Sequence, residues 1–492
     1  MIFYKKLKKL FSQQCIYNEI SSILEWDMAT MMPKNSRASR IKQIEKLTEN
    51  KKKIFEEIKK QELFSKVNVS KLNDDEKRNF FLMKKKYDFF ICLPQEVIVE
   101  NQKLAFECEG KWREAREKND FRIVKKIFSK LFRSVIEKAK ILSEYWEINK
   151  YDAMLFLYDK SFNCNQINKF TSDLEFFFKE NYDNFLLNQN KKKIYEFDSE
   201  LSEDDQYRLS KIVMKRFGFN FNNGRVDLSL HPFCGGYKDD IRITTKFNKY
   251  DFFSSFEALM HETGHALYEF GLPKKWKHQL IGESSGMAMH ESQSLFLEMQ
   301  IVKSKEFNFF LNNLLIKLFK KKTECWGADN LFFSRSKISK GFIRIESDEV
   351  HYPLHIIHRF KIEKKMFEEQ SVDDLPDLWN SEFKKIFNLN IKSDNEGCLQ
   401  DIHWFAGDFG YFPTYLIGAM IAAQLKSSIL EEIPDLKSNI KLGKLDTITN
   451  WLRKSIHQYG DRYCVDDLLK KITGKKLSTS FYKSHLKKRY LS

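Results

Sequence analysis

The chain has 492 residues, of which 42% are hydrophobic, 15% aromatic and 31% charged, with only 18 glycines and 8 prolines. This much apolar surface excludes a disordered chain, and the scarcity of helix-breaking residues favours long helices. A net charge of +16 would suit a nucleic-acid binder, but acidic residues are interleaved with the lysines as on solvated helix faces, so we expect no nucleic-acid partner.

Cysteine usage and apolar runs bear on the cellular compartment. The eight cysteines lie far apart and form no C-x-x-C pair, which is typical of free thiols in a reducing environment. The basic residues 5–9 are followed by polar residues, without the apolar stretch of a secretory signal. The longest apolar run, residues 415–423, is about half as long as a bilayer span. The sequence therefore predicts a cytoplasmic protein with no membrane partner.

In chain order, residues 1–150 predict successive amphipathic helices, because apolar side chains recur at three- and four-residue spacing. A polar, charged stretch at about 187–205 predicts an exposed loop between helices. The strand-like residues 226–231 and 241–244 then flank Gly235-Gly236, and this pattern predicts a small antiparallel hairpin. Helical periodicity returns after the hairpin and continues to the C-terminus.

The strongest chemical signal is the run His261-Glu262-Thr263-Gly264-His265. Residues four apart share one face of an α-helix, so both imidazoles can bind one zinc ion, and Glu262 can take a proton from metal-bound water. We expect a helix because Ser254 and Glu257 have capping-box spacing and Gly271 ends the amphipathic run. Two surface histidines on a helix are the alternative interpretation.

A catalytic zinc site needs a third protein ligand and an open position. The candidates for this ligand are Glu269, Glu283, Glu291 and Glu298. Glu269 lies one turn beyond His265, and a straight helix cannot wrap three residues around one ion, while Glu283 lies in a predicted loop. Glu291 is the predicted ligand, because it falls early in a second amphipathic helix and its carboxylate can project across to the first. Glu298 is expected at the surface or behind the ligands, and His290, about 100° around the helix from Glu291, is expected to pack beside them.

Six segments occur in order along the chain: H-P-F at 231–233, D-I-R-I-T at 240–244, H-E-T-G-H at 261–265, H-E-S-Q at 290–293, I-R-I-E-S-D at 343–348 and G-C-L-Q-D-I-H-W at 397–404. In order and spacing they resemble the signature segments of the carboxypeptidase Taq family of metallocarboxypeptidases. Ser347 stands where alanine is common in the fifth segment, and both residues are small. The resemblance covers essentially the whole chain.

This resemblance implies a mainly α peptidase domain with a deep active-site groove and a small antiparallel β-sheet beside the metal. Because no repeat or linker divides the chain, we expect a single domain over residues 1–492, with a helical part at roughly 1–220 and the hairpin and metal-site part at roughly 221–492. The resemblance also implies a homodimer that releases single C-terminal residues from peptides with broad specificity and acts poorly on C-terminal proline. The predicted ligands suit zinc, and cobalt as well.

An exopeptidase that acts at the C-terminus must bind a carboxylate, and a bidentate arginine does this best. Arg344 and Arg242 are the substrate-binding candidates because they lie in the signature segments. The alternative for Arg344 is an intrahelical pair with Asp348, and the alternative for Arg242 is a strand-face pair with Asp240.

The tetrahedral intermediate of peptide hydrolysis carries an oxyanion, which a second donor beside the metal would stabilise. His403 is the candidate catalytic donor, and Tyr411 and Tyr415 are candidate substrate-binding donors, with core packing as the alternative for each. Other histidines are expected to be structural, namely His231 beside the hairpin and a helix face, without an obvious carboxylate partner, made of His351, His355 and His358.

Three competing functions make different predictions. A zinc oligoendopeptidase with a similar helical groove would cut peptides internally, whereas a carboxypeptidase would shorten them one residue at a time. A non-catalytic protein on a degenerate scaffold would lack part of the catalytic set, but His261, Glu262, His265 and Glu291 are all present. A nucleic-acid binder would show salt-dependent retention on DNA.

Overall fold

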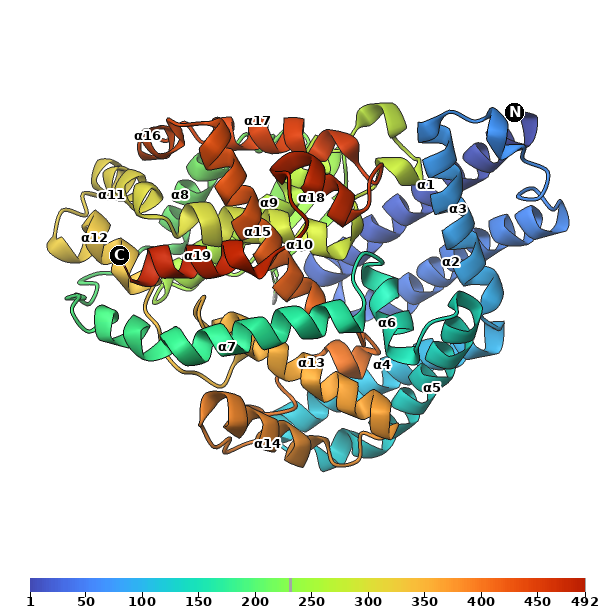
Figure 1. The fold of residues 1–492 in the computed structure, drawn as a ribbon, viewed down its shortest axis with the longest axis horizontal. Helices are drawn as coiled ribbons and strands as arrows, with labels where there is room; N and C mark the ends of the chain where they lie inside the picture. The colour runs from blue at the N-terminus through green and yellow to red at the C-terminus, as the bar shows by residue number, and fades with distance from the viewer. Residues whose placement is uncertain (230–231, 492) are drawn as a thin grey trace. The chain divides into compact units, whose positions relative to one another are not determined.

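A computed structural model describes residues 1–229 and 232–491, and within them it contains nineteen α-helices and one three-stranded sheet (Figure 1). The expected mainly helical fold is therefore confirmed. His231, which was expected to be structural beside the hairpin, lies outside the described residues. The chain divides into two compact units, and each unit combines segments that are far apart in sequence. The expectation of a single peptidase domain stays a prediction. In the described part of the chain, no helix is long and apolar enough to cross a membrane.

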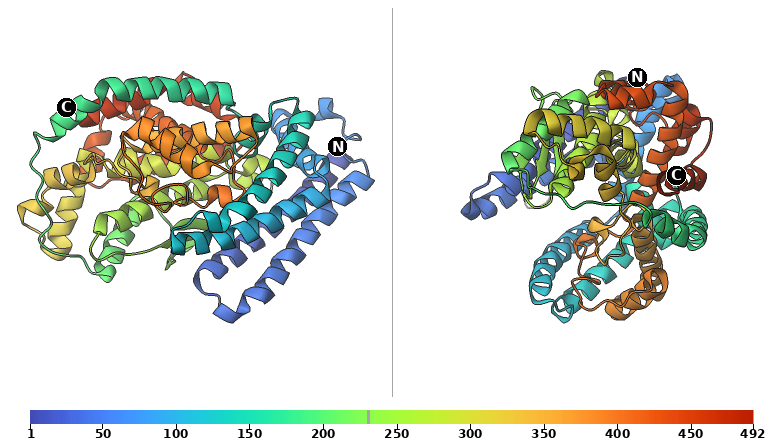
Figure 2. Two further views of the ribbon diagram at one scale, coloured as in Figure 1. Left: turned by 90° about the horizontal axis from the view of Figure 1, so that it is seen from below. Right: turned by 90° about the vertical axis from the view of Figure 1, so that its left-hand side faces the viewer.

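Unit 1 comprises Met1–Asp88, Lys193–Arg335 and Ile421–Leu477. Figure 2 shows α1 and α2 of this unit side by side, with only a short connection through η1 between them. The helices of unit 1 are α1 (Ile2–Thr30), η1 (Lys34–Ser36), α2 (Arg37–Lys60), η2 (Val69–Lys71), most of α3 (Asp74–Cys92), α8 (Glu203–Arg216), α9 (Phe252–Gly271), η3 (Lys274–Trp276), η4 (Leu280–Gly282), α10 (Gly286–Leu295), η5 (Phe296–Val302), α11 (Lys305–Phe319), η6 (Glu324–Trp326), α12 (Ala328–Arg335), the C-terminal part of α15 (Pro413–Glu432), α16 (Leu436–Lys441), α17 (Asp446–Ser455), η9 (His457–Tyr459) and α18 (Val465–Thr473).

Unit 2 comprises Phe89–Lys192, Ser336–Met420 and Ser478–Ser492. Its α7 and α19 lie against each other although they are about 300 residues apart in sequence, as the hydrogen bond from Asn188 to the carbonyl oxygen of Tyr490 shows (Figure 1). Part of its core is the cluster of Leu93, Leu142 and Ala153. The helices that lie wholly in unit 2 are α4 (Gln95–Lys118), α5 (Arg122–Trp146), α6 (Lys150–Tyr158), α7 (Cys164–Gln189), η7 (Arg344–Glu346), α13 (Tyr352–Glu369), α14 (Leu375–Phe387), η8 (His403–Ala406) and α19 (Thr479–Tyr490).

The sheet of unit 1 has the strand order β1-β3-β2, from β1 (Gly224–Leu228), β2 (Phe233–Tyr237) and β3 (Asp240–Thr245). β2 and β3 are antiparallel, but β1 runs parallel to β3, so the sheet is mixed where a purely antiparallel one was expected. The predicted turn at Gly235-Gly236 is instead part of β2. Gly236 has φ +87°, and a Cβ there would lie 2.0 Å from the carbonyl oxygen of Asp240. Glycine is therefore needed here because two backbones approach closely inside the sheet. In the sequence alone, a glycine pair required for this reason looks the same as a glycine pair in a turn.

Helix α9 packs against β3 and β2 and carries the H-E-T-G-H run. Its N-cap is Asp251, whose side chain accepts a hydrogen bond from the backbone N–H of Ser254 at 3.1 Å. The expected capping box of Ser254 and Glu257 is therefore wrong, because Asp251 three residues earlier already caps the helix. The helix ends at Gly271, as the sequence predicts.

Candidate metal centre

His261 and His265 lie one turn apart on α9, and Glu291 projects toward them from α10. Glu291 Oε1 lies 3.8 Å from His261 Nε2, and Glu291 Oε2 lies 3.7 Å from His265 Nε2. Ligand atoms of the three residues all lie within 4.8 Å of one another, and within residues 1–229 and 232–491 no other group of His, Cys, Asp and Glu does so. With bonds of roughly 2.0–2.1 Å, ligand atoms of a tetrahedral site are about 3.3 Å apart. The observed separations therefore suit one shared ion.

Gly264, the small residue of the motif, sets how closely α10 approaches α9. A Cβ at Gly264 would lie 2.5 Å from the carbonyl oxygen of Gln293 and 2.5 Å from Cα of Ser294, which are both backbone atoms of α10. Any larger residue must push α10 away, because backbone atoms cannot yield as a flexible side chain can. Glu291 would move with α10, so Gly264 controls the distance between the ligands on the two helices.

The chemistry of the donors fits a divalent metal. Two imidazoles and one carboxylate form a common ligand set of catalytic zinc, which leaves a fourth position for water or substrate. His265 Nδ1 lies 3.1 Å from the backbone carbonyl oxygen of His290, so Nδ1 carries the proton and Nε2 is left for the metal. Burial, with the nearby His290 and His261, holds the pKa of His265 well below its usual value, and the ring is therefore in the neutral form that metals bind.

Glu262 follows His261 directly in sequence but lies outside the group of His261, His265 and Glu291. Its side chain turns about 100° away from that of His261 around α9. Burial raises the pKa of Glu262 to about 7, with His261 opposing the shift and Glu291 adding to it. A carboxyl group with a pKa near neutrality can both accept a proton and return it, so the position and the acidity of Glu262 suit a general base.

A chain of charged side chains lies behind His261. The Nδ1–H of His261 donates to Oε2 of Glu298 at 2.8 Å, and Lys303 Nζ lies 3.6 Å from the other oxygen of Glu298. Lys303 Nζ also lies 3.1 Å from Glu257, to which Arg335 Nε donates at 2.7 Å. Hydrogen bonds behind a metal-binding histidine fix its tautomer and orientation. The sequence interpretation missed Lys303, Glu257 and Arg335, which carry no motif.

Glu298 lies in η5, the π-helix in which the chain continues after α10. The backbone N–H of Lys303 donates to the carbonyl oxygen of Glu298, five residues earlier, at 3.1 Å. Such π segments occur frequently at functional sites. Glu298 was expected either at the surface or behind the predicted ligands, and the structure places it behind His261.

The remaining glutamates considered as ligands have other partners. Glu269 Oε1 lies 3.1 Å from His290 Nε2, and the hydroxyl of Tyr237 donates to Glu283 Oε1 at 2.6 Å. The ring of His290 lies against that of His265, with the two Nδ1 atoms 2.7 Å apart. His290 therefore packs beside His265, as expected.

Both arginine candidates for carboxylate recognition have carboxylate partners within the chain. Arg242 donates through Nε and Nη2 to the two oxygens of Asp240 at 2.9 and 2.8 Å, which is the strand-face pair considered as an alternative. Arg344 does not pair with Asp348. Its Nε and Nη2 donate instead to Oδ1 of Asp401 at 3.1 and 2.8 Å. The alternative considered for Arg344 is therefore wrong, because residues 344–346 form a 3₁₀ turn and leave the guanidinium free to reach a distant segment.

Asp401 joins two buried guanidinium groups in unit 2. Arg359 Nε donates to its Oδ2 at 2.6 Å, opposite the bonds from Arg344. Burial alone would raise the pKa of Asp401, but Arg344 and Arg359 hold it far below its usual range. Two positive charges thus face one negative charge. Sequence reasoning missed Asp401, although its place two residues before His403 in a signature segment was a signal.

His403, Tyr411 and Tyr415 lie together in unit 2. His403 Nε2 lies 3.2 Å from the hydroxyl oxygen of Tyr415, and the rings of His403 and Tyr411 have centroids 5.4 Å apart. Burial lowers the pKa of His403 to about 4, with Asp401 opposing the shift, so the imidazole is neutral near pH 7. Its Nδ1 makes no hydrogen bond to any described residue. The structure thus brings the three predicted donors into one cluster.

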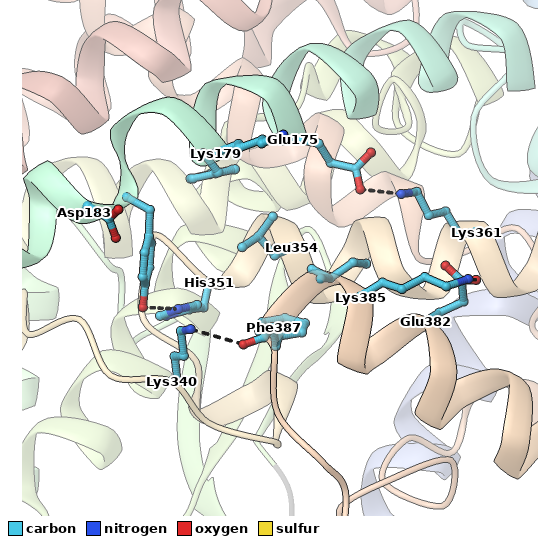
Figure 3. Close-up of a pocket in the computed structure, with 13 residues that line it drawn as sticks. Glu175, Lys179, Asp183, Lys340, His351, Leu354, Lys361, Glu382, Lys385 and Phe387 are labelled. Atoms are coloured by element: carbon cyan, nitrogen blue, oxygen red, sulfur yellow. Dashed lines mark hydrogen bonds and ion pairs between the residues drawn. The ribbon is translucent and has the colours of Figure 1, made fainter.

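A separate hollow of about 520 Å³ lies in unit 2 among α7, α13 and α14 (Figure 3). His351, expected to lack a carboxylate partner, contacts Asp348 through Nδ1 at 2.6 Å and the hydroxyl of Tyr182 through Nε2 at 3.2 Å. That expectation is wrong, because the turn before α13 brings Asp348 under the ring. Charges of both signs mix around the hollow, so it favours no one class of ligand; these charges belong to Lys179, Lys340, Lys361, Lys385, Glu175, Asp183 and Glu382.

Comparison with known proteins places these features in a family. The family model described as carboxypeptidase Taq (M32) metallopeptidase matches residues 6–490. Carboxypeptidase 1 of Bacillus subtilis is 31% identical over 494 residues, which cover 99% of this chain and 97% of that protein. Thermostable carboxypeptidase 1 of Pyrococcus furiosus is 31% identical over 477 residues, which cover 96% of this chain and 95% of that protein.

Solved structures agree with the sequence comparison. Metallocarboxypeptidase 1 of Trypanosoma cruzi superposes with a TM-score of 0.93 and 30% identity, and the match covers 100% of both chains. A carboxypeptidase structure from Pyrococcus furiosus has a TM-score of 0.93 and 29% identity, and the match covers 99% of both chains. The fold of the described chain is therefore that of these enzymes.

Proposed function

Because the chain belongs to the carboxypeptidase Taq (M32) family and is a metallocarboxypeptidase, we propose that it releases single C-terminal residues from peptides with broad specificity and acts poorly on C-terminal proline. The observation that carries this proposal is the grouping of His261, His265 and Glu291 beside the buried Glu262. This arrangement suits hydrolysis of a peptide bond by an activated water.

We propose zinc as the metal, with cobalt as the second ion that this ligand set suits. When bound, such an ion polarises the scissile carbonyl and lowers the pKa of a bound water. His261, His265 and Glu291 would hold the ion, and the bond from His261 to Glu298 supports this role by fixing the ring.

Glu262 is the proposed general base. Its carboxylate would take a proton from the attacking water and then give that proton to the nitrogen of the leaving amino acid. The raised pKa of about 7 supports both transfers, because the carboxyl group changes its protonation state at little cost near neutral pH.

Arg344 is proposed ahead of Arg242 for binding the terminal carboxylate. Both arginines donate through Nε and Nη2 to a carboxylate of the chain, but Arg242 has the two oxygens of Asp240 as partners, whereas Arg344 shares Asp401 with Arg359. The excess positive charge of that cluster suits an anionic substrate group. His403, Tyr411 and Tyr415 stay the predicted donors to the oxyanion.

Digestion of a peptide with a blocked N-terminus tests the proposal and separates it from the oligoendopeptidase alternative, which the family membership does not favour. The products are identified by mass spectrometry over time, with metal content measured on the same sample. We expect free C-terminal residues to appear one after another. Internal fragments without free amino acids would contradict the proposal.

We also propose a homodimer in the cytoplasm. Eight free cysteines among the described residues support a reducing compartment. Light scattering of the purified protein measures the mass directly, and a monomer at micromolar concentration would contradict the dimer.

A further inference from the structure

Glu363 is a fully buried glutamate on α13, within unit 2. Its Oε1 accepts a hydrogen bond from Trp404 Nε1 at 2.6 Å. Its Oε2 accepts one from the backbone N–H of Gly410 at 3.0 Å and one from the hydroxyl of Tyr151, on α6, at 2.7 Å. An indole and a backbone amide can only donate, so both oxygens of Glu363 must act as acceptors, as they do in a carboxylate.

Two of these three bonds hold the two ends of one loop. His403 and Tyr411, which are both proposed donors to the oxyanion, flank this loop in sequence. Trp404 directly follows His403, and Gly410 directly precedes Tyr411, so one carboxylate fixes the loop one residue inside each donor. Gly410 has φ +85°, and a Cβ there would lie 2.8 Å from the backbone nitrogen of Leu155, so this end of the loop also packs tightly on α6.

Helix α13 holds the same segment at a second point. Arg359 and Glu363 are four residues apart, so their side chains share one face of the helix. Arg359 Nε donates to Asp401 Oδ2 at 2.6 Å, and Arg359 Nη2 donates to Gln400 Oε1 at 2.6 Å. One face of α13 therefore holds the chain both before His403 and after it.

Folding stability alone does not explain a carboxylate at this place. Removing a carboxylate from water is costly, and Glu363 forms no ion pair with any residue that the structure describes. Burial raises the pKa of Glu363 to about 7, although Tyr151, Trp404 and Gly410 oppose the shift. The property that only a carboxylate offers here is an acceptor for each end of the loop at the same time.

We propose that Glu363 is a positioning residue for peptide hydrolysis, which holds both ends of residues 404–410 and thereby sets the geometry of His403 and Tyr411. The inference rests on the proposed function, in which these two side chains donate to the oxyanion. Such donors act only where they lie about 2.7–3.1 Å from the position of the oxyanion, so a small shift of the loop lowers the rate. The bound substrate does not yet carry this charge, so the shift should lower kcat and leave KM unchanged.

Glu363→Gln tests the inference because a glutamine can satisfy only one end of the loop. Its amide has one oxygen and one NH2 group, and the NH2 group cannot accept a hydrogen bond. Whichever way the amide turns, the NH2 group faces the N–H of either Trp404 or Gly410. We expect kcat to fall about 10- to 100-fold, which is less than the roughly 10²- to 10³-fold loss for a deleted oxyanion donor. KM and metal content should not change.

Tyr151→Phe is the matched control. It removes the third bond to the same carboxylate and leaves the bonds from Trp404 and Gly410 in place. Both variants lose a buried hydrogen bond, so both should unfold at a lower urea concentration than the wild type. Only Glu363→Gln releases an end of the loop, so Tyr151→Phe should keep the wild-type kcat.

The rates are measured on a pentapeptide with a blocked N-terminus at about pH 8, where the carboxylate form of Glu363 predominates. A phosphonate analogue of the same peptide mimics the tetrahedral intermediate. Its inhibition constant should rise in Glu363→Gln by the factor by which kcat falls, because both report the same donors. A role in stability alone would leave this constant and kcat unchanged.

Wild-type kcat in Glu363→Gln would overturn the inference, and so would an equal loss of kcat in Tyr151→Phe or an effect confined to KM. If Glu363→Gln does not fold, Trp404→Phe decides, because it removes the donor beside His403 and leaves the carboxylate in place. Trp404→Phe should lower kcat at unchanged KM, and wild-type kcat in this variant would equally overturn the positioning role.

His403→Ala separates this inference from the proposed function. The proposed function requires that the wild type releases C-terminal residues from the pentapeptide and that His403→Ala lowers kcat. Failure of the first would overturn the proposed function, and failure of the second would overturn the donor role on which the inference rests. A loss of kcat in His403→Ala together with wild-type kcat in Glu363→Gln would overturn only the positioning role of Glu363.

Discussion

Replacing Glu298 by alanine should weaken metal binding without removing any metal ligand. The carboxylate accepts the Nδ1–H of His261 at 2.8 Å, and its side chain is only 15% exposed, so solvent does not replace it well. Loss of such a partner typically weakens metal affinity about 10- to 100-fold, which is about 1.4 to 2.7 kcal/mol. Glutamine keeps an acceptor but no charge, and charge-assisted bonds are about twice as strong as neutral ones. Glu298→Gln should therefore lose about half of this free energy, or about three- to tenfold in Kd.

Competition with a chromogenic zinc chelator measures Kd for both variants, and circular dichroism checks that they fold. Glu306→Ala is the matched control, because Glu306 lies in the same unit on α11 and its only ion pair with a described residue is that with Lys437, at 3.7 Å. This control should bind zinc as the wild type does. A wild-type Kd for Glu298→Ala would refute the reasoning, and a greater loss in the glutamine variant than in the alanine variant would refute the role assigned to the charge.

His265→Ala should lose both metal and activity, and near-stoichiometric metal in this variant would overturn the ligand assignment. Glu262→Gln should keep its metal while kcat/KM falls by about 10² to 10⁴, as for a lost general base; metal analysis and a peptide assay distinguish this from loss of a ligand. Gly264→Ala should displace α10, lower the free energy of unfolding by about 1–3 kcal/mol and weaken metal binding, and thermal unfolding at wild-type temperature would contradict the close contact. Arg344→Lys keeps the charge but loses the fork, so it should lower kcat/KM on a free-acid peptide by about 2 kcal/mol, roughly thirtyfold, and reduce discrimination against the amidated peptide; full discrimination in the variant would move the carboxylate site elsewhere. Asp401→Ala should cost about 3–5 kcal/mol in urea unfolding, because two buried guanidinium groups lose their shared partner, and a smaller change would mean that water reaches them.

The grouping of His261, His265 and Glu291 could be predicted from sequence because its geometry is local. Two histidines four residues apart must share a helix face once the helix forms, and Glu291 needed only a second helix beside the first. The contribution of Gly264 could not be predicted in the same way. It depends on how α9 and α10 cross, and a helix crossing is set by the packing of both surfaces.

Side-chain pairs between segments that are distant in sequence could not be predicted. Arg344 and Asp401 are 57 residues apart, and no spacing rule connects them. The sequence predicted the arrangement of the strands wrongly for a related reason. Gly235-Gly236 is typical of a turn, and only the contact with Asp240 shows why glycine is needed within a strand. The N-cap of α9 shows that local sequence can also leave a choice open, because any of several polar residues near the start of a helix can serve as its cap.

The π-helix η5 has a consequence for the number of residues in this part of the chain. A π-turn holds about one residue more than an α-turn, so Lys303 lies five residues after Glu298 where an α-helix would need only four to bring two side chains to one face. Deletion of one residue between Glu298 and Lys303 would convert the π-turn to an α-turn and leave the two side chains on the same face. A relative with one residue fewer in this stretch would therefore keep the pair of Glu298 and Lys303, and a one-residue gap here in an alignment is compatible with the same site.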